Sequence, residues 1–121
     1  MTSQADLIAL IDRLRNGPTE QEWFEFKQNN FEPQLIGEYL SALANAACLA
    51  GKPRGYLIFG IDDRTHKITG TNFDPYKTKG KGNQDLHIWL SLGLHPNVGF
   101  DVTEVHHPDG RIILFNIIAA W

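Results

Sequence analysis

The sequence predicts an α+β domain in which helices pack on one mixed sheet. Some segments repeat apolar residues every three or four positions, as amphipathic helices do, whereas others alternate in polarity or are continuously apolar, as strands are. The expected order of elements is α-β-α-β-(β)-α-β-β. With 121 residues, of which 42% are hydrophobic, the chain is long enough for one core and too short for two.

The front of the chain predicts a helix followed by a strand. Leucine and isoleucine recur at helical spacing over residues 5–15. The Asn-Gly-Pro run at 16–18 ends this helix, because glycine accepts the left-handed cap and proline cannot continue a helix. Residues 22–28 change to a period of two, which places Phe24 and Phe26 on one face of a strand and charged residues on the other.

The middle of the chain predicts a second helix and a central strand. This helix begins at Pro33, a residue suited to the first helical turn, and ends at about Leu49. Residues 56–61 are apolar on both faces, as a strand covered on both sides is expected to be. A polar turn then leads into a short strand over residues 67–70.

The last third predicts a third helix and a hairpin. The helix is expected over residues 83–92, and strands over 98–106 and 111–118 are joined by the Pro-Asp-Gly turn at 108–110. The last strand is nearly all apolar and ends close to the carboxyl terminus. We therefore expect residues 1–121 to be a single domain from the N-terminal part of a longer protein.

Charge is distributed unevenly around a net value of -3. Residues 1–50 carry seven acids and three bases, whereas residues 64–81 carry five bases and one acid. A charged run is either a solvated face or a surface for phosphates. The chain has no secretory start and no apolar run near the ~20 residues that cross a bilayer, and its one cysteine, Cys48, fits a reducing compartment. These features predict a cytoplasmic protein.

Carboxylates lie near two of the predicted strands. Glu20 and Glu25 belong to the region of the first strand, and Asp62 and Asp63 end the central strand. If these strands are neighbours, the acids converge, and Mg²⁺ or Mn²⁺ held by such a cluster activates water against a phosphodiester. In the alternative interpretation Glu25 pairs with Lys27 and the two aspartates favour a turn. The spacing leaves both interpretations open.

The remaining motifs give weaker indications of function. The Gly51–Gly55 turn follows a helix and precedes a strand, the reverse of a Walker loop, so its two bases are either phosphate contacts or exposed cations. His106 and His107 are adjacent on a strand, so their side chains are expected on opposite faces. With one cysteine and no histidine pair at ligand spacing, no zinc site is expected.

Four segments in order carry a family pattern: EQEWFEFK at 20–27, IGEYLSALAN at 36–45, GYLIFGIDD at 55–63 and ITG at 68–70. They resemble the AlbA-like domain of the Schlafen family, which is called divergent AAA in bacterial regulators. The resemblance covers residues 20–70 by motif and 71–118 by the order of elements.

The resemblance implies an α+β fold related to the Alba nucleic-acid-binding proteins. In Schlafen ribonucleases two such lobes form a basic horseshoe around RNA, and three acids bind the metal. By position, these acids would be Glu20, Glu25 and either Asp62 or Asp63. In bacterial members the domain heads a longer chain with a winged-helix tail and is described as a DNA-binding or ATP-binding regulator. With one lobe, a horseshoe would need a homodimer.

We therefore expect the nucleic-acid-binding domain of a transcriptional regulator or of a metal-dependent endoribonuclease, acting on DNA or RNA. Glu20, Glu25 and Asp62 would hold Mg²⁺ or Mn²⁺, and Asp63 would complete the catalytic set. Six basic residues would contact the nucleic acid: Lys27, Lys52, Arg54, Lys77, Lys79 and Lys81. The alternatives are a non-catalytic interaction or sensor module and an ATP-binding domain of a larger regulatory protein.

Overall fold

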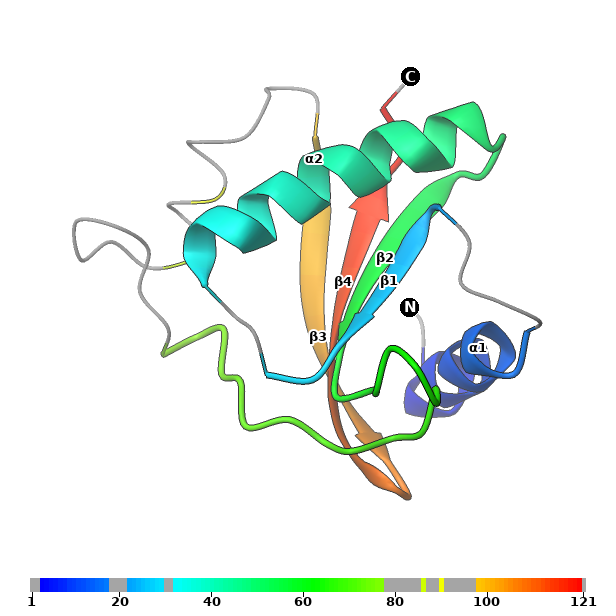
Figure 1. Cartoon of the computed structure of the whole chain (residues 1–121), viewed down its shortest axis with the longest axis vertical. Coiled ribbons are helices and arrows are strands. Elements are labelled where there is room, and N and C mark those ends of the chain that lie inside the picture. The colour runs from blue at the N-terminus through cyan, green and yellow to red at the C-terminus, as the bar shows by residue number, and fades with distance from the viewer. Residues whose placement is uncertain are drawn as a thin grey trace.

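A four-stranded mixed sheet with a helix on each face forms the core of the computed structural model (Figure 1). The structure describes residues 3–17, 22–29, 32–77, 86, 90 and 98–120. The helices are α1 (Gln4–Arg15) and α2 (Pro33–Leu49), and the strands are β1 (Phe24–Lys27), β2 (Arg54–Phe59), β3 (Phe100–His107) and β4 (Gly110–Ile118). In the sheet order β1-β2-β4-β3, β1 is parallel to β2 and the other neighbours are antiparallel.

The α+β class and most of the predicted elements are confirmed. Both helices of the first half agree with the sequence to within a residue, and the two last strands form the predicted hairpin. The third predicted helix, over 83–92, lies outside the described residues except for Leu86 and Leu90, and both of these are buried at 1% exposure.

The predicted strand over residues 67–70 is wrong. Only one isolated bridge, between Ile61 and Ile68, forms there. Two backbone features prevent a longer ladder. His66 has a φ of 61°, and Gly70 has a φ of 74°, so the chain turns on both sides of Ile68 before a strand can be extended.

The ends of both helices follow from local chemistry. At the start of α1 the Ser3 hydroxyl accepts a hydrogen bond from the amide of Asp6 at 3.1 Å, as an N-cap does. At the start of α2 the Glu32 carboxylate accepts one from the amide of Leu35 at 2.9 Å, and Pro33 occupies the first turn.

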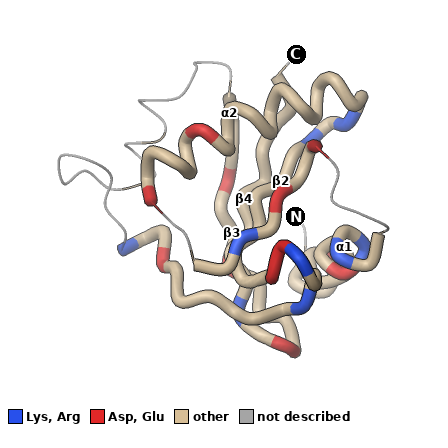
Figure 2. Tube along the Cα trace, viewed as in Figure 1, with Lys and Arg blue, Asp and Glu red and all other residues tan. Residues whose placement is uncertain are grey.

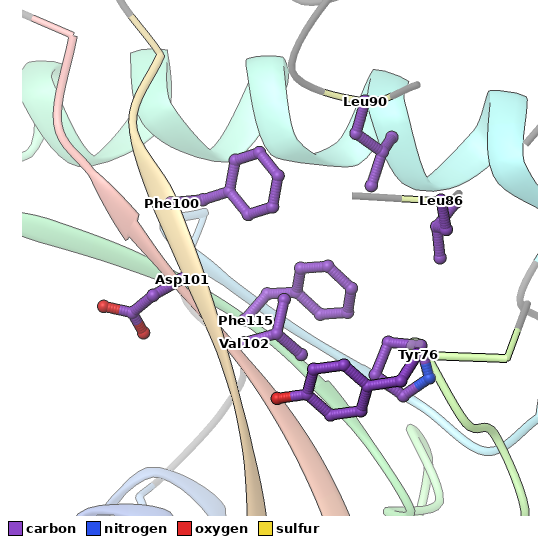
Figure 3. Close-up of a pocket in the computed structure, with 8 residues that line it drawn as sticks. Tyr76, Leu86, Leu90, Phe100, Asp101, Val102 and Phe115 are labelled. Atoms are coloured by element: carbon purple, nitrogen blue, oxygen red, sulfur yellow. The ribbon is translucent and has the colours of Figure 1, made fainter. Parts of the chain in front are cut away.

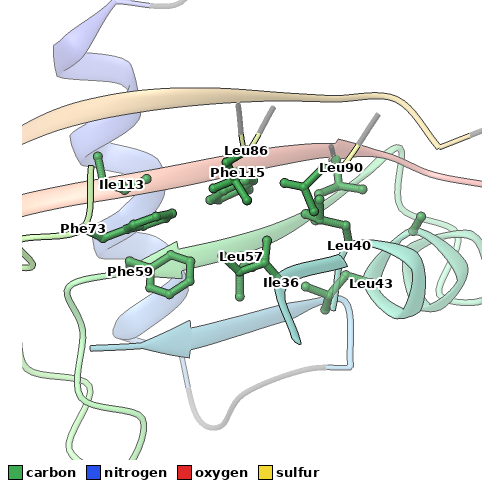
Figure 4. Close-up of a cluster of buried hydrophobic side chains, with 12 residues drawn as sticks. Ile36, Leu40, Leu43, Leu57, Phe59, Phe73, Leu86, Leu90, Ile113 and Phe115 are labelled. Atoms are coloured by element: carbon green, nitrogen blue, oxygen red, sulfur yellow. The ribbon is translucent and has the colours of Figure 1, made fainter. Parts of the chain in front are cut away.

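Each face of the sheet carries its own apolar core. On the face covered by α2, buried side chains from the helix meet those of β2 and β4, including Phe59 and Phe115 (Figure 4). On the other face, buried side chains of α1 meet those of β1 and buried side chains from part of β2, β3 and β4. Gly55 allows α2 to approach closely, because a Cβ there would lie 2.8 Å from the carbonyl oxygen of Leu43.

The Gln4 side chain ties α1 to the outer edge of β3. Its Nε2 donates to the carbonyl oxygen of Glu104 at 3.0 Å, and its Oε1 accepts from the amide of His106 at 2.9 Å. Because β4 pairs with the opposite edge of β3, these two backbone groups point away from the sheet. The side-chain amide of Gln4 thus makes the hydrogen bonds that a neighbouring strand would otherwise make at this edge.

A buried histidine makes the second link between α1 and β3. His106 and His107 lie on opposite faces, as predicted: His106 is exposed, and the side chain of His107 is 4% exposed. The Nδ1 of His107 accepts from the amide of Asp109 at 3.0 Å, so its Nε2 carries the proton and donates to Asp12 at 2.9 Å. Burial tends to raise the pKa of Asp12, but the hydrogen bonds from His107 and Arg15 outweigh it and lower that pKa.

Acid should therefore destabilise the domain partly through Asp12. Since its pKa is lower in the folded than in the unfolded chain, its contribution is complete above the ordinary pKa of 3.8 and is lost as the pH falls through the folded value. Urea unfolding at neutral pH and near pH 3 should show a smaller loss of stability for Asp12→Asn than for the wild type. Asp6→Asn, an exposed change in the same helix, is the control, and equal losses in wild type and Asp12→Asn would contradict this prediction.

Candidate nucleic-acid interface

The predicted acidic site lies where the parallel strands β1 and β2 end. Lys27 is paired with Phe59, and its carbonyl oxygen accepts from the amides of Gly60 at 2.7 Å and Ile61 at 3.1 Å. The two carboxyl ends therefore meet, and the chain leaving β2 passes beside Lys27. Glu20, the first acid of the predicted set, lies outside the described residues.

Asp62 serves the turn that follows β2. Its Oδ1 accepts from the amides of Arg64 at 2.8 Å and Thr65 at 3.0 Å, and its Oδ2 accepts from the side chain of Gln28 at 2.9 Å. The hydrogen bonds from Thr65 and Arg64 lower the pKa of this carboxyl. Both of its oxygens are thus engaged within the fold.

The charges of Glu25 and Asp63 act on Lys27, which lies at the carboxyl end of β1. The Nζ of Lys27 lies 4.8 Å from the centre of the Tyr39 ring. Partial burial tends to lower the pKa of Lys27, but its interaction with the Tyr39 hydroxyl and the charges of Glu25 and Asp63 outweigh burial and raise that pKa. The interaction with Tyr39 and the charges of the two carboxylates thus favour the ammonium form of Lys27.

These contacts show how the described acids are placed relative to the predicted metal site. Among the residues that the structure describes, no three His, Cys, Asp or Glu side chains lie together as a metal site requires. Asp62 accepts hydrogen bonds within its turn, and Glu25 and Asp63 act on Lys27 through their charges. Since Glu20 lies outside the described residues, the predicted set of three acids, which would offer a divalent ion several carboxylate oxygens, stays a prediction.

The four predicted basic residues that the structure describes lie at different places on the molecule (Figure 2). Lys27 lies at the carboxyl end of β1, whereas Lys52 and Arg54 lie at the opposite, amino end of β2. The five steps between Arg54 and Phe59 separate these ends by about 17 Å. Lys77 is exposed beyond the turns that follow β2, and Lys79 and Lys81 lie outside the described residues.

Lys52 and Arg54 lie beside a part of the sheet that neither described helix covers. On the α1 side of β2 and β4, the residues beneath the helix are fully buried, as Ile58 and Leu114 are. Further along the same face Arg54 is exposed, Tyr56 and Asn116 are partly exposed, and Ile118 is 48% exposed. We call this group the open sheet face: Arg54, Tyr56, Asn116 and Ile118, with Trp23 at its margin.

The open sheet face combines aromatic rings with cations. The rings of Trp23 and Tyr56 have centroids 6.1 Å apart, and the Nζ of Lys52 lies 5.3 Å from the centre of the Trp23 ring. Arg54 Nη1 donates to Asn116 Oδ1 at 3.4 Å. Burial raises the pKa of Tyr56, although the nearby charges of Arg54 and Arg13 act to lower it. Lys52 thus lies over the Trp23 ring, and the charges of Arg54 and Arg13 act on Tyr56.

Sequence reasoning missed this face, because residues 56–61 look apolar on both sides. One residue of the last strand indicates that this face is partly exposed. Asn116 is the one polar residue between Ile112 and Ile118, and it is paired with Tyr56 across the sheet. A polar side chain within a buried strand marks the place where its cover ends.

The other face of the sheet contains a small hollow of about 200 Å³ (Figure 3). Its walls are mostly apolar, and they include Phe100, Val102 and Phe115. The carboxylate of Asp101 lies on the opposite side of β3 from these side chains. Among the described residues that line the hollow, none is cationic. Within the described chain, neither helix has the length and apolar character that a membrane span requires.

Comparison with known proteins identifies the family. No curated protein matches the chain. Among solved structures, the crystal structure of the DIP2311 protein from Corynebacterium diphtheriae is similar, with 23% identity and a TM-score of 0.45 over 97% of this chain and 23% of that one. The chain thus spans under a quarter of that protein's length. The model of the family described as Schlafen, AlbA_2 matches residues 20–121. The resemblance carried by the four sequence segments is thereby confirmed, and the chain belongs to the Schlafen AlbA_2 family.

Proposed function

We propose that this domain binds nucleic acid through the open sheet face, as part of a regulatory protein. The observation that supports this most directly is the pair of rings, Trp23 and Tyr56, with Lys52 over the first ring and Arg54 exposed on the strand that carries the second. Aromatic rings stack on bases, and lysine and arginine contact phosphates. The combination suits a nucleic acid better than it suits a purely apolar partner.

The local charge matters because the whole chain has a net charge of -3. A protein of this charge does not attract phosphates over its entire surface, so a binding site has to be a local group of cations. Lys52 and Arg54 provide such a group, and both are exposed. Moderate, salt-sensitive affinity is expected for so few contacts.

Removing these cations should weaken binding. Lys52→Ala and Arg54→Ala should each reduce the affinity for a labelled oligonucleotide and lower the slope of log K against log salt by about 1, since each removes one phosphate contact. Fluorescence anisotropy over a range of salt concentrations measures both quantities. Lys67→Ala, an exposed lysine beyond the other end of β2, is the matched control. Equal binding by wild type, Lys52→Ala and Arg54→Ala would refute the proposal for this face.

Cleavage of the bound nucleic acid is a second proposal, and the position of Glu25 and Asp62 near the adjoining carboxyl ends of β1 and β2 favours it. Glu20, Glu25 and Asp62 would be the residues that hold Mg²⁺ or Mn²⁺, and the ion would supply an activated water. Incubation of labelled single-stranded RNA and tRNA with Mn²⁺ tests this. Cleavage should require the metal and should be lost in Glu25→Ala. No cleavage, or equal cleavage by Glu25→Ala, rejects the nuclease and leaves the binding function in place.

A further inference from the structure

We infer that the open sheet face takes unpaired bases, so that its ligand is a single strand rather than a duplex. This inference rests on the proposed nucleic-acid function and adds the form of the nucleic acid to it. It follows from the angle between the two rings, from the shape of the surface that carries them and from the position of the cations.

The two rings cannot both serve one continuous stack of bases. The planes of Trp23 and Tyr56 are inclined at 59° to each other, with centroids 6.1 Å apart. Bases in a duplex are stacked nearly parallel, and their faces are covered by their neighbours. Rings at such an angle can each receive a base only when successive bases are separated and turned apart, which a single strand permits.

The surface is also unsuited to reading a duplex. Tyr56 is half-buried on the face of a central strand, and it packs against the core beneath α1. Recognition of base edges in a duplex needs an element that enters a groove, such as a helix or a two-stranded ribbon. A partly buried ring on the face of a sheet does not enter a groove, whereas an unpaired base can approach it.

Polar side chains on and beside the open sheet face could contact the phosphates and base edges of a single-stranded nucleic acid. Arg54 belongs to the open sheet face, and Lys52 lies over Trp23 at its margin, so both cations are available to the phosphates of a nucleic-acid strand that crosses this face. Asn116 lies between Arg54 and the covered part of β4, and its side chain can both donate to and accept from the edge of a base. Stacking, phosphate contact and edge contact thus come from adjacent residues.

The test compares one sequence in two forms, single-stranded and annealed to its complement, for RNA and for DNA. The wild type should bind the single strand more tightly than the duplex at the same salt concentration. Tyr56→Leu keeps an apolar side chain against the core but has no ring face, and it should weaken single-strand binding about 5- to 150-fold, which corresponds to the ~1–3 kcal/mol of one base stack. Tyr56→Phe retains the ring and should bind as the wild type does.

The outcomes separate this inference from the function on which it rests. If the duplex binds as tightly as the single strand, or if Tyr56→Leu leaves single-strand binding unchanged, the inference is overturned while nucleic-acid binding stands. If the wild type binds neither form, both are overturned. Thermal unfolding of Tyr56→Leu and Tyr56→Phe verifies that each variant is folded at the assay temperature. Should Tyr56→Leu be unfolded there, Arg54→Ala is used instead, and a loss confined to the duplex overturns the inference.

Discussion

Replacing Phe115 with alanine is expected to destabilise the domain by about 3–5 kcal/mol. Phe115 lies at the centre of the core beneath α2 and is fully buried. Its ring contacts those of Phe59, Phe73 and Phe100, with centroids 6.0 to 6.2 Å apart. Because these neighbours come from separate segments, they cannot close the cavity without moving the backbone. Urea unfolding followed by far-UV circular dichroism measures the loss.

The matched control lies three residues away on the same strand. Ile118 is 48% exposed, so Ile118→Ala removes less buried surface and should cost less than about 1 kcal/mol. If Phe115→Ala lost no more stability than Ile118→Ala, the assignment of the central core to this ring would be wrong.

Gly60→Ala is expected to cost about 2–5 kcal/mol, from two separate causes. Gly60 has a φ of 111°, a conformation that residues with a side chain rarely adopt. A Cβ at this position would also lie 2.8 Å from the carbonyl oxygen of Arg111 and 2.9 Å from Cδ1 of Ile112. Backbone strain contributes about 1–2 kcal/mol and overpacking about 1–3 kcal/mol.

Gly51→Ala separates these two causes. Gly51 also has a positive φ, 69°, but a Cβ there would meet nothing within 4 Å. It should therefore cost only the backbone strain of about 1–2 kcal/mol. In urea unfolding Gly60→Ala should therefore lose more stability than Gly51→Ala, because overpacking adds to the backbone strain. Equal losses would mean that the neighbours of Gly60 move aside without a free-energy cost.

Most of the fold could be predicted because periodicity and chain breaks are local. The alternation around Phe24 and Phe26 gave the first strand and its buried face, and Pro33 marked the start of the second helix. The sheet order could not be read in this way, since pairing of β2 with β4 joins segments more than 50 residues apart. The strand over 67–70 was predicted from its composition, whereas the backbone at His66 and Gly70 decides the structure there.

The candidate site was less predictable, because it depends on which neighbours a charge finds. Spacing alone left Glu25 either a metal ligand or a partner of Lys27, and the structure places it close enough to Lys27 to interact with it. Asp62 was expected to face a metal, yet its hydrogen bonds with Arg64 and Gln28 depend on a turn whose geometry periodicity does not describe. Tyr56 was counted with the core, since the sequence does not indicate how far α1 extends over the sheet.

The side chain of Gln4 has a consequence for handling the protein. Because it is hydrogen-bonded to the carbonyl of Glu104 and the amide of His106, these groups cannot pair with a strand from another molecule. A version of the chain shortened past Gln4 would retain the sheet but present an unprotected border, along which copies can join into larger aggregates. Purification tags and truncations are therefore better placed so that the first helix remains intact.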